Sequence, residues 1–156
     1  MVLRIIKFDI LWGSYDLAFL KGFGISGTDS ARLATITMKK RILILDDEPT
    51  NRALIIHLLS RDYDLFLFED GLQGLTWLES GNKVDLVITD LEMPKMDGFE
   101  FISRVSNDPR FQNIGMVLTS SLEEEEVSKR LKCKRPYLQK PLEPFMLKST
   151  LSEMLE

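Results

Sequence analysis

Short apolar runs alternate with stretches of helical periodicity from residue 41 onward, and this alternation limits the fold more than any other feature of the sequence. The apolar runs predict five strands, at 42–45, 65–68, 84–89, 114–118 and 137–139. Apolar residues at helical spacing predict a helix after each strand, over 49–59, 72–78, 98–105, 122–132 and 147–155. Strands that alternate with helices form a parallel sheet. We therefore expect an α/β fold: a doubly wound five-stranded parallel sheet with helices on both faces.

The composition suits one packed domain and excludes several kinds of site. The chain has 156 residues, of which 44% are hydrophobic and 28% charged. Its net charge of −4 gives no basic surface for nucleic acid or an anionic membrane, so neither is expected as a partner. Cys133 is the only cysteine and His57 the only histidine, which excludes an internal disulfide and zinc sites with several such ligands. We expect His57 to flank the core of a helix, not to act in catalysis.

The composition changes near Met38. Residues 1–37 hold four of the nine glycines, and their four basic and three acidic residues sum to +1. The stretch 22–27 fits G-x-G-x-x-G, but only a weak helix could follow it, so a chance match is favoured over a dinucleotide site. Neither a secretory signal nor an uninterrupted apolar span is visible. We predict an N-terminal extension over 1–37, a folded domain over 38–156 and a cytoplasmic location.

Polar side chains follow four of the predicted strands at their carboxyl ends. They are three carboxylates, two hydroxyls and an ammonium: Asp46, Asp47, Asp90, Thr119, Ser120 and Lys140. Ligands of open α/β sheets bind at this edge. Three clustered carboxylates repel one another unless a cation neutralises them, and an all-oxygen site suits Mg²⁺. A metal and a lysine beside a carboxylate nucleophile favour phosphoryl transfer. The alternative is that the aspartates merely begin turns, which their joint placement disfavours.

Four segments together resemble the receiver domain of two-component response regulators, of the CheY-like kind. They are LDDEPTNR at 45–52, DLEMPKMDG at 90–98, VLTS at 117–120 and YLQKP at 137–141. The resemblance covers about 38–156, and the second segment is the most specific. It implies the flavodoxin-like receiver fold and a role in phosphorelay signal transduction.

The resemblance also implies a role for individual residues. Asp90 matches the aspartate that accepts a phosphoryl group from a histidine kinase or a histidine phosphotransfer protein. Asp46, Asp47 and Asp90 match the Mg²⁺ ligands, with the backbone carbonyl of Glu92. Thr119 and Lys140 match the residues that contact the phosphoryl group, and Thr119 and Tyr137 match the switch pair. The bond before Pro141 is expected to be cis.

Some positions depart from the family pattern or carry charge of their own. The stretch 132–136 replaces the small residues usual before the fifth strand, on the face that commonly meets partners. Glu92 adds an acid near the metal, at a position that affects phosphate loss, and the small Ser120 should leave access to Asp90 open. Acids at 123–126 and bases at Lys129, Arg130 and Lys132 suit the dipole of a solvated helix, with Glu125–Lys129 and Glu126–Arg130 as pairs. Trp77 is expected to pack against neighbouring side chains or to lie on the helix surface, and not to form a ligand site.

We interpret the chain as a stand-alone response regulator whose phosphorylation alters an interaction surface. Its partners would be the phosphodonor protein, an unknown downstream protein, and a second copy in a phosphorylation-linked dimer. One alternative is an aspartate-based phosphatase, since residues 46–50 approach D-x-D-x-T, although Glu48 replaces the second aspartate. The other is a receiver-like adaptor that never uses its phosphate. Multiple turnover of a phosphoester would favour the phosphatase. A chain that does not respond to a phosphodonor would favour the adaptor.

Overall fold

The computed structural model describes residues 39–131 and 134–155, which form one five-stranded parallel sheet with helices on both sides. The strands are β1 (Arg41–Leu45), β2 (Asp64–Phe68), β3 (Leu86–Asp90), β4 (Gly115–Ser120) and β5 (Tyr137–Gln139). The helices are α3 (Pro49–Leu59), α4 (Gly71–Glu79), α5 (Gly98–Asn107), α6 (Glu124–Arg130) and α7 (Pro144–Leu155), with a 3₁₀ turn η1 (Pro109–Phe111). The strand order is β2-β1-β3-β4-β5, and the expected fold class is confirmed.

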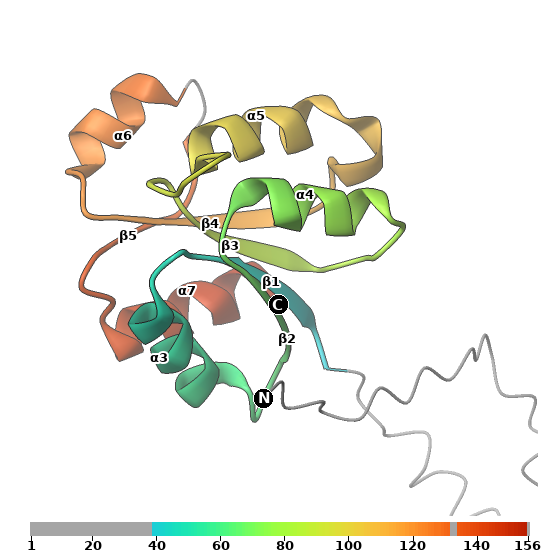
Figure 1. The fold of residues 1–156 in the computed structure, drawn as a ribbon. Helices are drawn as coiled ribbons and strands as arrows, with labels where there is room; N and C mark the ends of the chain where they lie inside the picture. The colour runs from blue at the N-terminus through green and yellow to red at the C-terminus, as the bar shows by residue number, and fades with distance from the viewer. Residues whose placement is uncertain (1–38, 132–133, 156) are drawn as a thin grey trace, which may run out of the picture. The chain divides into compact units, whose positions relative to one another are not determined.

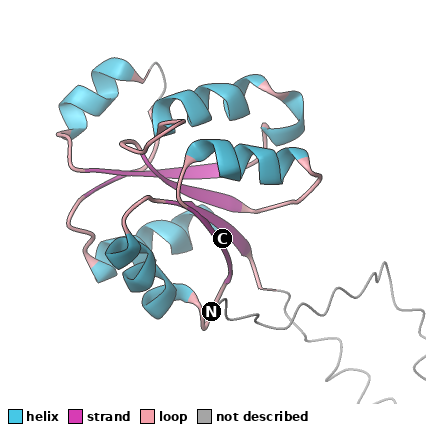
Figure 2. Ribbon diagram, viewed as in Figure 1, coloured by secondary structure: helices cyan, strands magenta, loops and turns pink. Residues whose placement is uncertain are grey.

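The helices divide between the two faces of the sheet. Helices α4, α5 and α6 cover one face and α3 and α7 the other (Figures 1 and 2). Each face has its own apolar core, because successive residues of a strand point to opposite sides. Leu43 and Leu45 face the larger core with Phe101, whereas Ile42 and Ile44 face the core beneath α3 and α7. This burial on both sides explains why the strands are continuous apolar runs.

Aspartates begin two of the helices and fix where they start. Asp70 accepts a hydrogen bond from the Gln73 amide at the start of α4, and Asp97 accepts one from Glu100 at the start of α5. Such caps satisfy backbone N–H groups that have no partner inside the helix. Pro49 occupies the first turn of α3, where a missing N–H group does no harm.

The boundaries of several elements differ from those expected. Strand β3 begins at Leu86, two residues later than expected, and includes Asp90, while β4 extends through Ser120. Helix α6 covers only 124–130 instead of 122–132, and η1 was not expected. Leu72 belongs to the apolar pattern that predicted this helix, but its side chain is 47% exposed, whereas Leu75 and Leu78 are buried.

Some sequence features lie outside the described residues. These are the extension over 1–37 with its G-x-G-x-x-G stretch, together with Lys132 and Cys133. Within the described residues, His57 is exposed on α3. No helix in this described part is long and apolar enough to cross a membrane.

Candidate functional site

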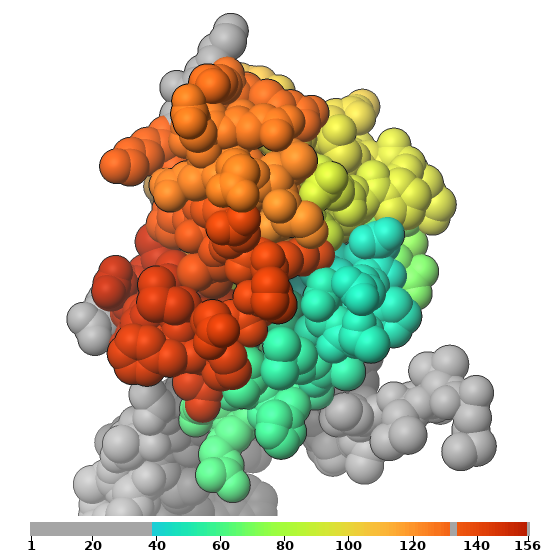
Figure 3. Space-filling view, turned by 90° about the vertical axis from the view of Figure 1, so that its left-hand side faces the viewer, coloured from blue at the N-terminus to red at the C-terminus, as the bar shows by residue number. Residues whose placement is uncertain are grey.

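The ends of four parallel strands bring the candidate residues to one edge of the sheet. Asp90 ends β3 and is the register partner of Thr119 in β4. Asp46 directly follows β1, and Lys140 directly follows β5, where its backbone amide donates to the carbonyl of Ser120 at 2.8 Å. In the space-filling view, the segments that follow β1, β3, β4 and β5 share one face, coloured cyan, yellow-green, orange and red (Figure 3).

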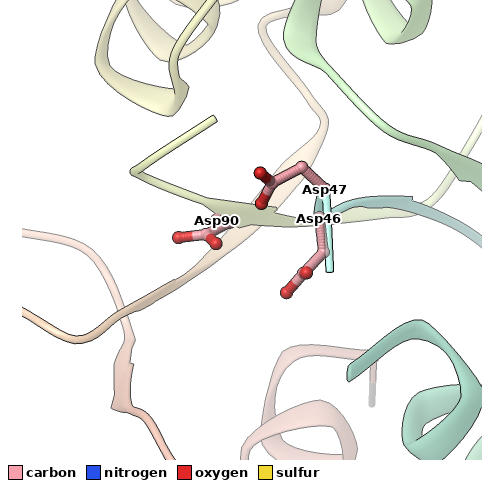
Figure 4. Close-up of side chains that lie close together, drawn as sticks. All are labelled: Asp46, Asp47 and Asp90. Atoms are coloured by element: carbon pink, nitrogen blue, oxygen red, sulfur yellow. The ribbon is translucent and has the colours of Figure 1, made fainter. Parts of the chain in front are cut away.

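Asp46, Asp47 and Asp90 form a cluster of carboxylates at this edge (Figure 4). One oxygen of each lies within 4.8 Å of the others. Asp46 and Asp90 are buried, whereas Asp47 is exposed. Hard oxygen donors at this spacing are the ligands that Mg²⁺ takes in proteins. The residues present therefore fit a bound Mg²⁺, with Asp47 on the side open to solvent.

Lys140 joins the two buried carboxylates. Its Nζ contacts Oδ2 of Asp90 and lies 3.0 Å from Oδ2 of Asp46. Burial alone would lower the pKa of Lys140, but its bonds to both carboxylates outweigh burial and hold the pKa above its usual value. The lysine thus stays charged.

Asp90 sits in an environment that disfavours its charged form. Burial raises the pKa of Asp90, and the nearby charge of Asp46 adds to that effect. The ammonium of Lys140 and the Glu92 amide, which donates to Oδ1 at 3.1 Å, only partly offset it. A buried carboxylate with a raised pKa, one neighbouring cation and one neighbouring anion is typical of functional sites.

The loop after β1 is held by side chains from the first turns of α3. The Asn51 amide donates to both oxygens of Asp46, at 3.4 and 3.2 Å, and to Glu48 at 3.0 Å. Arg52 donates to the backbone oxygen of Asp46 at 2.6 Å and pairs with Glu69 at 3.3 Å. Sequence reasoning missed both supports, although Asn51 and Arg52 lie inside the segment that carried the resemblance.

A second set of contacts connects the site to the loop between β4 and α6. The Ser120 hydroxyl donates to Oε2 of Glu92 at 3.2 Å and accepts from the Leu122 amide at 3.0 Å. The Tyr137 hydroxyl lies within hydrogen-bond distance of the carbonyls of Ser120 and Leu122. Burial raises the pKa of Tyr137, and nearby acids add to the shift, so the phenol keeps its proton to donate. The Lys140–Pro141 bond is cis, as the resemblance implies.

The charged side chains of α6 and Trp77 of α4 contact neighbouring side chains. Lys129 pairs with Glu125 at 2.9 Å, as expected. The guanidinium of Arg130, expected to pair with Glu126, instead lies 3.8 Å from the centre of the Phe99 ring. Trp77 packs on Phe66 with ring centres 4.6 Å apart, which confirms a packing role.

An open hollow of about 480 Å³ adjoins the carboxylates. Asp47 and Glu92 line it on one side, with Phe99 and Arg130 among the other lining residues. The carboxylate cluster is therefore open to solvent on the side of Asp47.

Known proteins share this fold and these motifs. The family model of the response regulator receiver domain matches residues 42–152. Chemotaxis protein CheY1 of Helicobacter pylori is 33% identical over 119 residues, which are 74% of this chain and 96% of that protein. The solved structure of chemotaxis response regulator CheY4 of Vibrio cholerae has a TM-score of 0.68 and 27% identity, covering 76% of this chain and 100% of that chain.

Other relatives are much longer than the matching part. Sensor histidine kinase CheAY of Helicobacter pylori is 39% identical over 83 residues, which are 51% of this chain but 10% of that kinase. Three further curated relatives match over 10% to 32% of their lengths. Similar domains thus occur both alone and inside larger signalling proteins. By the family match, the fold and the ordered motifs at one sheet edge, the chain belongs to the receiver domains of two-component response regulators.

Proposed function

We propose that the chain accepts one phosphoryl group on Asp90, in a reaction that depends on Mg²⁺, from a histidine kinase or a histidine phosphotransfer protein. The observation that carries the proposal is the convergence of Asp46, Asp47 and Asp90 with the ammonium of Lys140. Family membership supports the reaction class.

The residues of this site have separate tasks in the proposed transfer. A carboxylate oxygen of Asp90 forms the new bond to phosphorus as the phosphorus–nitrogen bond of the donor breaks, and the donor imidazole takes up a proton from water. Lys140 stays within reach of the phosphoryl oxygens, and the hydroxyl of Thr119 lies on the adjacent strand. Mg²⁺ bound to the carboxylates would offset negative charge on those oxygens.

The consequence of phosphorylation would pass through the loop after β4. Ser120 contacts Glu92 through its side chain and Lys140 through its backbone, while Tyr137 contacts the same loop from β5. A change of charge at Asp90 would therefore act on Ser120, Lys140 and Tyr137, which belong to or adjoin the surface formed by α6, β5 and α7. We propose that this surface meets the downstream protein.

The approach of the donor protein would use the same side of the molecule. Phe145 and Met146 lie in the first turn of α7, soon after Lys140, and their side chains are 78% and 51% exposed. Large exposed apolar side chains near a site are common at contacts between proteins. Phe145→Ala should lower transfer from a protein donor and leave transfer from acetyl phosphate unchanged.

The proposal is tested by the stoichiometry of phosphorylation. The full chain is incubated with labelled acetyl phosphate, with Mg²⁺ or with EDTA, beside Asp90→Asn and the control Asp85→Asn at the opposite sheet edge. We expect one label per chain for the unchanged protein and for Asp85→Asn, and none with EDTA or for Asp90→Asn. Multiple turnover of a small phosphoester would favour the phosphatase, and a chain without Mg²⁺-dependent label would favour the adaptor.

A further inference from the structure

The loop between β3 and α5 contains a residue in an unfavourable backbone conformation. Lys95 has a φ of 65°, in the left-handed region that glycine occupies without strain. A lysine in this conformation is less stable than a glycine would be, and contacts of the surrounding structure hold it there.

The side chain of Lys95 reaches the residue that caps α4. Its Nζ lies 2.7 Å from Oδ2 of Asp70, which caps α4. Asp70 is fully buried, and its two oxygens also accept hydrogen bonds from the backbone and side-chain amides of Gln73. Burial alone would raise the pKa of Asp70, but the bonds from Lys95 and Gln73 hold it below the usual value. Lys95 therefore neutralises a buried carboxylate.

The residues that follow Lys95 and Asp70, Met96 and Gly71, make a second contact. The amide of Gly71 donates to the carbonyl of Met96 at 3.0 Å. A Cβ atom at Gly71 would lie 2.8 Å from that same oxygen, so the backbones approach closely. Two successive residues of the loop, Lys95 and Met96, are thus bound to two successive residues at the start of α4.

The other end of this loop is attached to the candidate phosphorylation site. Glu92 donates its amide to Asp90, and Gly98 donates its amide to the carbonyl of Leu91 at 3.2 Å. A Cβ atom at Gly98 would lie 2.2 Å from the backbone oxygen of Asp90. The loop is thus attached to α4 through Lys95 and Met96, and to the end of β3 through Glu92 and Gly98.

We infer that Lys95 and Asp70 are positioning residues: their ion pair binds the 91–97 loop to α4 and so holds Asp90 and the backbone of Glu92 in the geometry that Mg²⁺ binding requires. The inference rests on the proposed function. It adds a support for the site that lies on α4, an element that contributes none of the candidate ligands. A protein that binds over the start of α4 and disturbs this pair would therefore change the Mg²⁺ affinity of the site.

The test compares the full chain with Lys95→Met, Lys95→Arg and Asp70→Asn. Lys129→Met is the matched control, because Lys129 is an exposed lysine in an ion pair like Lys95, but its partner Glu125 on α6 is exposed instead of buried. Mg²⁺ affinity is measured by titration calorimetry, and exchange of the Gly71 amide by NMR in metal-free protein. Urea unfolding gives the stability of each variant.

Lys95→Met and Asp70→Asn should weaken Mg²⁺ binding about tenfold, the low end of the range for groups that orient metal ligands, because the pair acts on the ligands only through the loop backbone. The Gly71 amide should exchange faster in both, and phosphorylation by acetyl phosphate should be slow at limiting Mg²⁺ and recover at saturating Mg²⁺. Lys95→Arg should restore the affinity, and Lys129→Met should match the unchanged chain in every measurement.

The outcomes separate this inference from the proposed function. If Lys95→Met lowers stability while its Mg²⁺ affinity stays that of the unchanged chain, the pair is merely structural and the inference is overturned. An equal loss of affinity in Lys129→Met would also overturn it. If the unchanged chain neither binds Mg²⁺ nor accepts a phosphoryl group, the proposed function fails and the inference fails with it.

Discussion

Two buried aspartates, Asp70 at the start of α4 and Asp90 at the end of β3, each pair with a lysine, yet their environments act in opposite directions. The pKa of Asp70 is lowered and that of Asp90 is raised. Asp70 meets only donors: the ammonium of Lys95 and two amides of Gln73. Asp90 shares the single ammonium of Lys140 with Asp46.

The difference shows how one kind of ion pair serves two purposes. A carboxylate surrounded by donors is stable as an anion and holds structure. When two carboxylates share one cation, a further positive charge stabilises their anionic forms. The first arrangement is complete, whereas the second is suited to binding a metal ion. This contrast leads to four predictions, all measured as changes in the free energy of unfolding in urea, in metal-free protein unless Mg²⁺ is added.

The largest effect is expected for Lys140→Met. The substitution leaves Asp46 and Asp90 buried together without their cation, which should lower stability by about 3 kcal/mol. Added Mg²⁺ should recover more stability in this variant than in the unchanged chain. Equal gains from Mg²⁺ in both proteins would show that Lys140 does not balance the carboxylates.

A smaller effect is expected for Gly98→Ala, which tests how tightly the end of β3 is packed. The new Cβ atom would lie 2.2 Å from the backbone oxygen of Asp90 and 2.8 Å from the Cα atom of Leu91. Backbone atoms cannot move aside cheaply, so stability should fall by about 2 kcal/mol. Gly71→Ala is the comparison: its new Cβ atom would lie 2.8 Å from the backbone oxygen of Met96, a less severe overlap than the 2.2 Å at Gly98, so its loss of stability should be smaller. A larger loss for Gly71→Ala would reverse the proposed order of rigidity.

Asp70→Asn tests the stabilising ion pair of Asp70 with Lys95 through the pH dependence of stability. The asparagine can still cap α4 but carries no charge for Lys95, and stability at neutral pH should fall by about 1 kcal/mol. Because the folded pKa of Asp70 lies below its ordinary value of 3.8, the carboxylate's contribution is complete above that pH and is lost as the pH falls through the folded pKa. The unchanged chain and the variant should therefore converge at low pH. A gap that stays constant to the acid limit would contradict the assignment.

The smallest effect is expected for Lys129→Met. Its pair with Glu125 joins two side chains that are 72% and 82% exposed. Solvent screens such a pair, so stability should change by less than about 0.5 kcal/mol. A loss as large as that of Asp70→Asn would show that burial does not distinguish these ion pairs.

Much of the fold was predictable because the strands are buried on both faces. Runs such as Ile42 to Leu45 can hardly be anything but central strands, and the aspartates after them mark the carboxyl edge. The ends of the elements were less predictable. Asp90 and Thr119 were expected after their strands but belong to them, because ladder hydrogen bonds, which sequence does not show, continue to those residues.

The sequence predicted which residues form the candidate site, but not which residues hold them in place. The motifs named the carboxylates and Lys140, since these residues follow successive strands. The contacts of Asn51 with Asp46 and of Lys95 with Asp70 depend on loop conformation, and the latter joins residues 25 positions apart. Nothing local in the sequence marks Lys95 as having a positive φ or Asp70 as its partner.

The most direct test of the account is to locate the phosphoryl group. The full chain is phosphorylated with acetyl phosphate and Mg²⁺, and the acyl phosphate is reduced with borohydride, which converts a phosphorylated aspartate to homoserine. Peptide mass spectrometry then identifies the position. We expect homoserine at position 90 and unmodified aspartate at positions 46, 47 and 70. Homoserine at any of those three positions, or at none of the four, would contradict this expectation.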